Sequence, residues 1–430
     1  MTIASQQQRN QPPALTGPVP GPRSRELAER LARVESRNVT CLTPDAPIFW
    51  ERAQGSNVWD VDGNRFVDLS GAFGVANVGH AHPDVIAAIE AQSSILLHGM
   101  GDVHPPRIKV ELLEALTARY PAGVESRGVL LSSGSDAVET AIKTAQLATG
   151  RPGIIAFEGG YHGLAFGALD ATWRSDFRKP FETRLPEATA HATFGDASSV
   201  ADSARRLAER GIETGAVLVE PVQGRGGEHV PPSGFLRELR ELCTRNRWLL
   251  IADEIYTGFG RTGRLFACDH ESVVPDLLCV GKGLSSGMPI SACLGRAEVM
   301  EAWPLSTGEA LHTQTFLGHP ASCAAALASI GVLESEKLIA RSAEVGASVL
   351  AYAIERLGTS VREVRGMGLM IGIDCLSGDA AMRACKSALE QGFILLPSGE
   401  DGRVLSITPP LCIAEALLRS GIDVLARELG

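Results

Sequence analysis

A chain of 430 residues is too long for one small core, and the usual domain size of about 100–200 residues predicts two or three packing units. Hydrophobic residues make up 44% and charged residues 21%, which is typical of a globular protein and excludes a fibrous or largely disordered chain. Fifty acidic against forty basic residues give a net charge of -10, which disfavours nucleic acid and anionic membrane surfaces as partners.

The nine cysteines form no CxxC pair, so the sequence predicts neither a metal site nor a dithiol motif. Most of them lie in apolar runs, and we expect reduced core residues of a cytoplasmic protein. The sequence has no run of about 18 apolar residues, and its N-terminus lacks a charged start followed by an apolar stretch. We therefore expect neither a membrane span nor a secretion signal.

Four segments can be distinguished along the chain. Residues 1–22 are rich in Gln and Pro without apolar periodicity, and we expect a flexible tail. Residues 23–83 begin with a helical pattern and continue with a hairpin predicted around the turn at residues 62–64, as the N-terminal segment of a small domain. Residues 84–325 are predicted to form a large domain, and residues 326–430 the C-terminal α+β part of the small domain.

Short apolar runs alternate with helical stretches within the predicted large domain. Each run is bounded by Gly, Pro or Asp, as is typical of buried strands in a mainly parallel sheet. The sequence therefore predicts the α/β fold class for this part of the chain. The runs are RGVLLSS, PGIIAFE, GAVLVEPV, WLLIADE, DLLCVGKG and PISACLG.

A predicted strand ends just before Gly134 and Ser135, and the apolar spacing of the following residues indicates a helix. At such a helix start, free backbone amides and the positive end of the helix dipole converge, and this arrangement binds phosphate. A glycine there lets the anion come close. Taken alone, however, the segment is explained more simply as an ordinary capped helix.

Polar and aromatic side chains follow two further predicted strands. Tyr161 and His162 follow a Gly-Gly turn, where an aromatic ring can stack on a planar heteroaromatic ligand. Glu220 and Gln223 follow the run GAVLV, which places them at the carboxyl edge of the sheet, where open α/β sheets bind their ligands. A lone tyrosine is more often a plain core or surface residue, so the position of Tyr161 is informative only together with the other motifs.

Asp253 and Glu254 end the apolar run WLLIA. A carboxylate drawn into a partly buried place requires a cationic partner, and a pyridinium nitrogen would serve. The glycines at 258, 260 and 263 form a GxGxxG match, which is the fingerprint of nucleotide binding. This signal is weak here, because no helix clearly opens after the last glycine.

Lys282 differs from the other five lysines of the chain. It is flanked by glycines between two apolar strands, whereas the others lie among polar or amphipathic neighbours. Desolvation lowers the pKa of a lysine, and a neutral amine is the nucleophile needed for an imine with an aldehyde. We therefore predict a chemical role for Lys282 rather than a solvated surface charge.

Together and in order, these motifs resemble the class III aminotransferases, the pyridoxal-phosphate-dependent group that includes ornithine and 4-aminobutyrate aminotransferases and related amino-acid and amino-lactam racemases. The resemblance covers the chain from about residue 45 to the C-terminus. It implies fold type I, the aspartate-aminotransferase-like fold, with a mainly parallel seven-stranded sheet in the large domain and a small α+β domain. It also implies pyridoxal 5'-phosphate (PLP) as cofactor, an amine or amino acid and a 2-oxo acid as substrates, and a homodimer with shared active sites. The matching segments are SGSDAVETAIK, YHG, EPVQG, ADEIYTGFGRTG, GKGLSSGMPIS and TQTFLGHPASCAAA.

The same resemblance implies a role for each site residue. Lys282 would hold PLP as a Schiff base and move the substrate proton, and Asp253 would pair with the pyridinium nitrogen. The other implied cofactor-binding residues are Gly134 and Ser135 at the phosphate, Tyr161 and Ile255 on the two faces of the ring, Gln223 near the ring hydroxyl, Thr315 at the phosphate of the neighbouring subunit's cofactor, and His162 and Glu220 beside them.

Three positions depart from the family pattern: His319 stands where an asparagine is expected before Pro320, and the other two concern substrate binding. Leu164 and Ser406 stand where members acting on ω-amino acids usually have arginines, which grip a carboxylate with two hydrogen bonds. Arg403 is a candidate substitute. The departures weaken a 4-aminobutyrate or ornithine assignment and leave a racemase as the alternative to an aminotransferase. An inactive PLP-binding protein would be expected to lack Lys282 or to have an added DNA-binding domain, and neither is seen.

Overall fold

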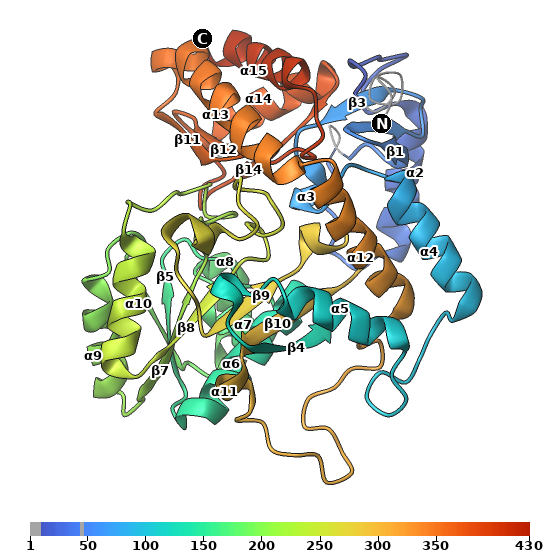
Figure 1. The fold of residues 1–430 in the computed structure, drawn as a ribbon. Helices are drawn as coiled ribbons and strands as arrows, with labels where there is room; N and C mark the ends of the chain where they lie inside the picture. Colours follow the sequence, from blue (N-terminus) through green and yellow to red (C-terminus); the bar gives the residue numbers. More distant parts are fainter. Residues whose placement is uncertain (1–9, 44–46) are drawn as a thin grey trace.

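A seven-stranded sheet lies at the centre of the molecule, in a computed structural model that describes residues 10–43 and 47–430 (Figure 1). Strand β10 is antiparallel to both of its neighbours, and the other neighbouring strands are parallel. The prediction of a mainly parallel seven-stranded sheet is therefore confirmed. In spatial order the strands are β4 (Ser126–Leu131), β10 (Ser291–Arg296), β9 (Leu277–Val280), β8 (Leu249–Asp253), β7 (Thr214–Val219), β5 (Gly153–Phe157) and β6 (Thr189–Ala192).

The six predicted apolar runs correspond to every strand of this sheet except β6, which the sequence reading missed. As an edge strand with the sequence TAHA, β6 leaves Thr189 and His191 partly exposed and so lacks an apolar run.

Alternate residues of the central strands point to opposite faces of the sheet, and both faces are covered by helices. In β7, Ala216 and Leu218 pack in the cluster that includes α6, α7 and α11, whereas Val217 and Val219 pack in the cluster that includes α9 and α10. Burial on both faces explains why these strands are continuous apolar runs. The helices around the sheet are α5 (Arg107–Thr117), α6 (Gly134–Thr149), α7 (Phe166–Ala171), α8 (Ser175–Arg178), α9 (Ser199–Glu209), α10 (Phe235–Asn246) and α11 (Ala297–Met300).

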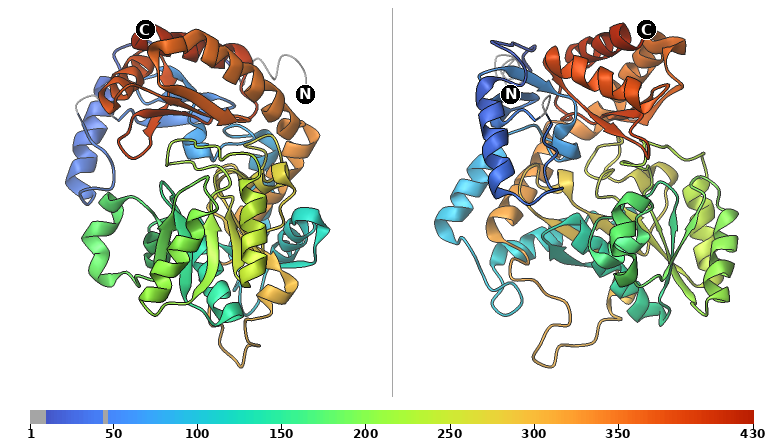
Figure 2. Two further views of the ribbon diagram at one scale, coloured as in Figure 1. Left: turned by 90° about the vertical axis from the view of Figure 1, so that its left-hand side faces the viewer. Right: turned by 180° about the vertical axis from the view of Figure 1, so that it is seen from behind.

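Two smaller sheets are built from the two ends of the chain. The predicted hairpin is present as β2 (Asn57–Asp60) and β3 (Arg65–Asp68), with β1 (Trp50–Gln54) beside β2. The short strand β13 (Phe393–Ile394) comes from the C-terminal part and pairs in parallel with β3. The N- and C-terminal segments therefore share a sheet and lie together beyond one end of the large sheet (Figure 2).

The third sheet belongs wholly to the C-terminal part. Its strands run in the order β11-β12-β15-β14, and all neighbouring strands are antiparallel. The predicted boundary at 325/326 falls inside the continuous helix α12, and the domain limits stay a prediction. None of the helices in the described ranges is long and apolar enough to cross a bilayer. The remaining elements are β11 (Glu363–Met367), β12 (Met370–Asp374), β14 (Leu396–Ser398), β15 (Val404–Ile407), α2 (Pro22–Val34), α3 (Gly71–Gly74), α4 (Pro83–Ile95), α12 (Pro320–Ser335), α13 (Leu338–Leu357), α14 (Gly378–Glu390) and α15 (Glu415–Leu429).

The prediction of a flexible tail over residues 1–22 is wrong for its second half. The backbone of Ala14 pairs with that of Arg65 in both directions, at 2.9 and 2.8 Å. The side chain of Asn64 accepts hydrogen bonds from the backbone amides of Thr16 and Gly17, and α2 already begins at Pro22. Composition could not reveal these partners, because they lie about 50 residues away in sequence. Residues 1–9 lie outside the described residues.

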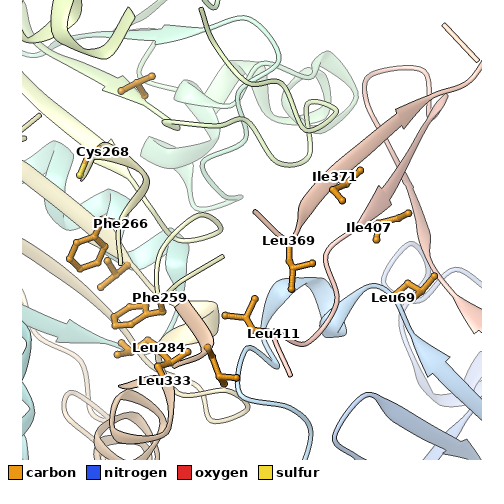
Figure 3. Close-up of a cluster of buried hydrophobic side chains, with 14 of the residues drawn as sticks. Leu69, Phe259, Phe266, Cys268, Leu284, Leu333, Leu369, Ile371, Ile407 and Leu411 are labelled. Carbon is orange, nitrogen blue, oxygen red and sulfur yellow. The ribbon is translucent and has the colours of Figure 1, made fainter. Parts of the chain in front are cut away.

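One buried apolar cluster crosses from the loops of the large sheet to the C-terminal sheet (Figure 3). Phe259, Phe266 and Leu284 come from segments that follow strands of the large sheet, whereas Leu369 and Leu411 come from the C-terminal part. All five side chains are at most 1% exposed. This shared core fixes the C-terminal sheet against the carboxyl edge of the large sheet, where the predicted site residues lie.

Candidate active site

Five segments that follow strands of the large sheet meet at one edge. They follow β4, β5, β7, β8 and β9, whose carboxyl ends point the same way. A cavity of about 340 Å³ lies between them, and we call it the sheet-edge cavity. Its lining residues are Gly134, Ser135, Tyr161, His162, Gly163, Leu164, Glu220, Arg225, Asp253, Ile255, Tyr256 and Lys282. Eight of the ten predicted site residues are therefore brought together, and Gln223 and Thr315 are not.

Lys282 follows β9 and points into this cavity. Its Nζ lies 4.3 Å from the centre of the Tyr256 ring. Burial lowers the pKa of the Lys282 amine to about 8, against the opposing charges of Asp253 and Glu220 and with a further lowering by Arg225. The backbone of Lys282 has φ +39°, a conformation that costs a non-glycine residue about 1 kcal/mol or more. A partly neutral amine is thus held in a strained backbone between two buried strands.

Asp253 ends β8 and forms a buried pair with His162. Its Oδ2 lies 2.8 Å from His162 Nδ1, and its Oδ1 accepts a hydrogen bond from the backbone amide of Ile255 at 3.2 Å. Burial acts to lower the pKa of His162, but the hydrogen bond and charge of Asp253 and the charge of Glu220 outweigh it and raise that pKa. His162 therefore donates its Nδ1 proton to Asp253, which fixes the position of that carboxyl group inside the protein.

Glu254, next in the chain, has a structural role instead. Its carboxylate accepts hydrogen bonds from the backbone amides of Ala267 and Cys268 at 2.9 and 2.8 Å and from the hydroxyl of Thr257. Of the two acidic residues that the sequence singled out, only Asp253 lines the sheet-edge cavity.

Glu220 lies beneath the loop that contains Tyr161. Its two carboxylate oxygens accept hydrogen bonds from the backbone amides of Tyr161 and Gly224, at 2.8 and 3.0 Å. Burial raises the pKa of Glu220, and the nearby charge of His162 opposes that rise. Glu220 thus fixes the position of Tyr161, and its carboxylate is satisfied without an arginine partner.

The start of α6 forms one end of the sheet-edge cavity. Ser133 is the N-cap, and its hydroxyl accepts a hydrogen bond from the backbone amide of Asp136 at 3.2 Å. Among the described residues, no acceptor pairs with the backbone amides of Gly134 and Ser135. A Cβ on Gly134 would lie 3.0 Å from two side-chain carbons of Ile255, so any larger residue here would require the Ile255 side chain to move. The two free amides and the helix dipole form an anion-binding end.

A second cavity of about 260 Å³ shares Tyr161, Arg225, Tyr256 and Lys282 with the first. We call it the β14–β15 cavity, because its far wall comes from those strands. Its other lining residues are Ser70, Phe73, Arg174, Glu228, Leu396, Pro397, Ser398, Ser406 and Thr408. Lys282 therefore faces two chambers, one with an anion-binding end and one bounded by the C-terminal sheet.

Gln223 and Thr315 lie outside both of these chambers. The Gln223 amide donates a hydrogen bond to the backbone carbonyl of Glu158 at 2.7 Å, and Gln223 lines a separate cavity of about 530 Å³. This contact does not support the predicted position of Gln223 near a ring hydroxyl of the cofactor. Thr315 is exposed, in the segment between α11 and α12.

Arg403 does not replace the arginines expected at positions 164 and 406. Its guanidinium is bound to Asp374 at 2.7 Å and to Asp401 at 3.2 Å, and it lines the same separate cavity as Gln223. Leu164 and Ser406, in contrast, line the sheet-edge and β14–β15 cavities respectively. The places where the sequence departs from the family pattern are therefore within the site.

Arg225, Tyr256 and Glu228 line the chambers, but the sequence reading did not single them out. Arg225 and Glu228 lie within eight residues of the recognised motif EPVQG, and Tyr256 lies three residues after Asp253. For Arg225 and Glu228, a charged residue just after a recognised motif was the sequence feature that could have indicated them.

Two other features do not belong to the site. A hollow of about 960 Å³ lies away from Lys282, and four of its lining arginines form ion pairs, as in the 2.6 Å contact between Arg240 and Asp276. The GxGxxG match is a packing loop, because a Cβ on Gly263, where φ is +89°, would lie 2.7 Å from the Ala343 Cβ in α13.

Comparison with known proteins gives a consistent result. The sequence profile of the family described as aminotransferase class-III matches residues 42–429. The 4-aminobutyrate aminotransferase of Mycobacterium leprae is 36% identical, over 96% of this chain and 97% of its own. The ornithine aminotransferase of Toxoplasma gondii, crystallised with PLP at partial occupancy in its active site, aligns with a TM-score of 0.85 and 29% identity over 94% of each chain. A PLP-bound amine transaminase from an uncultivated Pseudomonas species aligns with a TM-score of 0.81 and 30% identity, over 93% of this chain and 99% of that one.

Proposed function

Because the chain belongs to the class III aminotransferase family and is a PLP-dependent aminotransferase of fold type I, we propose that Lys282 and Asp253 are its catalytic residues. We also propose that it transfers an amino group between an amine or amino acid and a 2-oxo acid. The relatives named above act on different amines, so they do not define the substrate. All three are named as aminotransferases, which favours transamination over the racemase alternative.

The residues of the sheet-edge cavity fit this cofactor in three respects. The two unpaired amides at Gly134 and Ser135 suit a phosphate, the buried carboxylate of Asp253 suits a protonated ring nitrogen, and the Lys282 amine suits an aldehyde. Tyr161 and Ile255 line the cavity between these ends and offer apolar surfaces to a ring. When bound, PLP supplies the aldehyde and the ring that accepts electrons from the substrate.

The protein then has three tasks. Lys282 is the proton carrier, because a buried amine with a pKa of about 8 can both accept and return a proton near neutral pH. Asp253, hydrogen-bonded by His162, keeps a negative charge in place opposite the start of α6. Glu220 fixes Tyr161 through its backbone amide and so orients the aromatic wall of the site.

We infer a homodimer from two neighbouring segments that expose apolar side chains. Residues 95–106 and 301–318 are linked by a 2.9 Å hydrogen bond between Thr313 and Asp102, and the second segment extends away from the large sheet (Figure 1). Thr315 lies in this second segment and is proposed to reach the cofactor phosphate of the partner. The exposed apolar side chains are Ile95, Leu97, Met100, Val103, Leu305, Leu311 and Phe316, all at least 54% exposed. Light scattering should give twice the chain mass, and a monomer of full activity would contradict this proposal.

The cysteines support the proposed cytoplasmic location. Six of the nine are buried. Burial raises the pKa of both Cys243 and Cys385 to about 12, so these thiols are unreactive core groups rather than partners awaiting oxidation.

The depressed pKa of the Lys282 amine beside the buried Asp253 is the observation on which the proposed roles depend. Purified holoenzyme should show a visible absorbance band, and borohydride should trap cofactor on Lys282, as read by peptide mass spectrometry. Lys282→Ala should lose both signals, and Lys179→Ala, at an exposed position, should keep them. Trapping on another lysine would contradict the assignment. Incubation of one amino-acid enantiomer with and without a 2-oxo acid separates the two reactions, because only racemisation continues over many turnovers without the acceptor, whereas transamination stops after one equivalent of substrate per cofactor.

A further inference from the structure

Two arginines line the β14–β15 cavity together with Lys282. Arg174 lies between α7 and α8, and Arg225 follows β7. The cavity contains one carboxyl group, that of Glu228, whose pKa burial raises to about 7, although the hydroxyls of Ser406 and Ser398 and the charge of Arg365 oppose this rise. The positive charges therefore outnumber the negative ones in this chamber, which favours an anionic group on whatever enters it.

Arg225 is the less engaged of the two guanidinium groups, although the Nε of Arg174 also has no hydrogen-bond partner. Arg174 is paired with Asp176 at 3.2 Å, whereas no carboxylate among the described residues forms an ion pair with Arg225. The Cζ of Arg225 lies 5.2 Å from the centre of the Tyr161 ring and 5.8 Å from that of Phe177. The two rings contact the guanidinium through cation–π interactions, which leave its five N–H groups available to donate hydrogen bonds.

The backbone of Arg225 is fixed where its side chain can serve both chambers. Its carbonyl accepts a hydrogen bond from the amide of Gly399 at 3.0 Å, which ties the residue to the segment between β14 and β15. Arg225 lines the sheet-edge cavity as well as the β14–β15 cavity, so it borders the space around the Lys282 amine from both sides. A guanidinium offers the paired donors that a carboxylate binds best.

The other arginines of this region are already paired. Arg365 binds Asp374 at 3.2 Å and Glu363 at 2.7 Å, and Arg403 binds Asp374 and Asp401. Both line the separate cavity of about 530 Å³ and neither lines the chambers at Lys282. Their charges are already neutralised by partners within hydrogen-bonding distance.

We propose that Arg225 binds the carboxylate of the substrate and makes this enzyme select amino acids over simple amines. The inference rests on the proposed function, because it assigns the substrate class of the same site. It predicts that a substrate with a carboxylate binds better than the same amine without one. Arg225 is then a specificity residue, and on the Lys282 amine it acts only as a minor contribution to the lowered pKa.

The test compares two pairs of substrates that differ only by a carboxylate, namely 4-aminobutyrate with propylamine and L-ornithine with 1,4-diaminobutane. Purified holoenzyme is mixed with each compound without acceptor, and kcat and KM for the first half-reaction are followed by the cofactor absorbance. Arg225→Gln should lower kcat/KM for the carboxylated member of a pair by about 10- to 100-fold, mainly through KM, as expected for loss of a charge-assisted hydrogen-bond pair. For the matching amine the change should stay below about threefold. Arg225→Lys should fall between, and Arg403→Gln should change neither.

Four other results of this experiment are possible, and each contradicts a different statement. If Arg225→Gln lowers kcat/KM equally for both members of a pair, Arg225 acts by positioning Tyr161 and the inference fails. If the variant loses cofactor on dialysis with unchanged substrate preference, Arg225 serves the cofactor instead. If wild-type enzyme reacts with the amines but not with their carboxylated counterparts, the inference fails while the aminotransferase roles stand. If no compound in a wider panel of amines and amino acids changes the cofactor absorbance, the proposed roles fail and the inference with them.

Discussion

The buried carboxyl group of Glu228 allows a quantitative test, because its burial should change how the free energy of unfolding depends on pH. Its side chain is 1% exposed, on the wall of the β14–β15 cavity, and accepts a hydrogen bond from the Ser398 hydroxyl at 2.7 Å. Burial raises the pKa of Glu228 to about 7 from its ordinary value of 4.5, against the opposing effects of Ser406, Ser398 and the charge of Arg365. The folded protein therefore binds this proton more tightly than the unfolded chain does.

The sign of the stability effect follows directly from that difference. Because the folded state binds the proton more tightly, Glu228 destabilises the fold as the pH rises from about 4.5 to about 7, and the loss is complete above about 7. A difference of one pKa unit corresponds to about 1.4 kcal/mol, so the full loss is about 3.5 kcal/mol. Between about pH 5.5 and pH 8 the change is about 2 kcal/mol. Glu228→Gln keeps the size and an acceptor oxygen but removes the charge, so the variant should not show this loss.

Urea unfolding of wild type and Glu228→Gln at these two pH values, with equal saturating cofactor, measures the effect. The variant should gain about 2 kcal/mol relative to wild type on going from about pH 5.5 to pH 8. Glu344→Gln, at an exposed position of α13, is the control and should show no such pH-dependent gain. An equal free-energy difference at both pH values would refute the reasoning, since it would mean that Glu228 ionises normally in the folded protein.

Three further predictions follow from single contacts. Attachment of PLP to apoprotein should speed up with pH and level off above about 8, because the neutral Lys282 amine predominates there, and a rate still rising beyond about pH 10 would contradict the lowered pKa. Gly134→Ala should weaken PLP binding about tenfold in an absorbance titration, because its Cβ would lie 3.0 Å from Ile255, whereas Gly331→Ala, which meets nothing, should not. Arg261→Lys should lower the free energy of unfolding in urea by about 2–4 kcal/mol. The buried Arg261 guanidinium donates hydrogen bonds to Leu369 O, Pro409 O and Asn77 Oδ1, and a single ammonium group cannot make all three. A decrease below about 0.5 kcal/mol would contradict this prediction.

The cofactor end of the site could be predicted from sequence because its parts are local. Asp253 and Lys282 are placed by the ends of apolar strands, and Gly134 by the strand-to-helix turn, all of which are visible as patterns within about ten residues. The order of these motifs then indicated the family, and the family profile over residues 42–429 confirms it. Parallel strands that end at the same edge bring such motifs together without any long-range information.

What could not be predicted depends on contacts between distant segments. The segment from Asn10 to Gly21 seemed a free tail, because its partners lie in the hairpin. The two-residue strand β13 pairs with β3 across more than 300 residues, and nothing in the sequence Phe393–Ile394 indicates it. Gln223 carried a family expectation, but its amide is bound by the Glu158 carbonyl, a contact that only the folded loop reveals.

The difference between the two ends of the site has a physical reason. The sheet-edge cavity is proposed to bind the cofactor, and its walls are fixed by strand ends and by hydrogen bonds such as that between Asp253 and His162. The β14–β15 cavity is closed by a separate antiparallel sheet, and Ser406 in its wall is small and uncharged. A change of charge there leaves the strand ends at Lys282 in place. Substrate preference can therefore be altered by residues such as Arg225 while the position of the reacting amine stays fixed, and this separation makes the paired-substrate experiment interpretable.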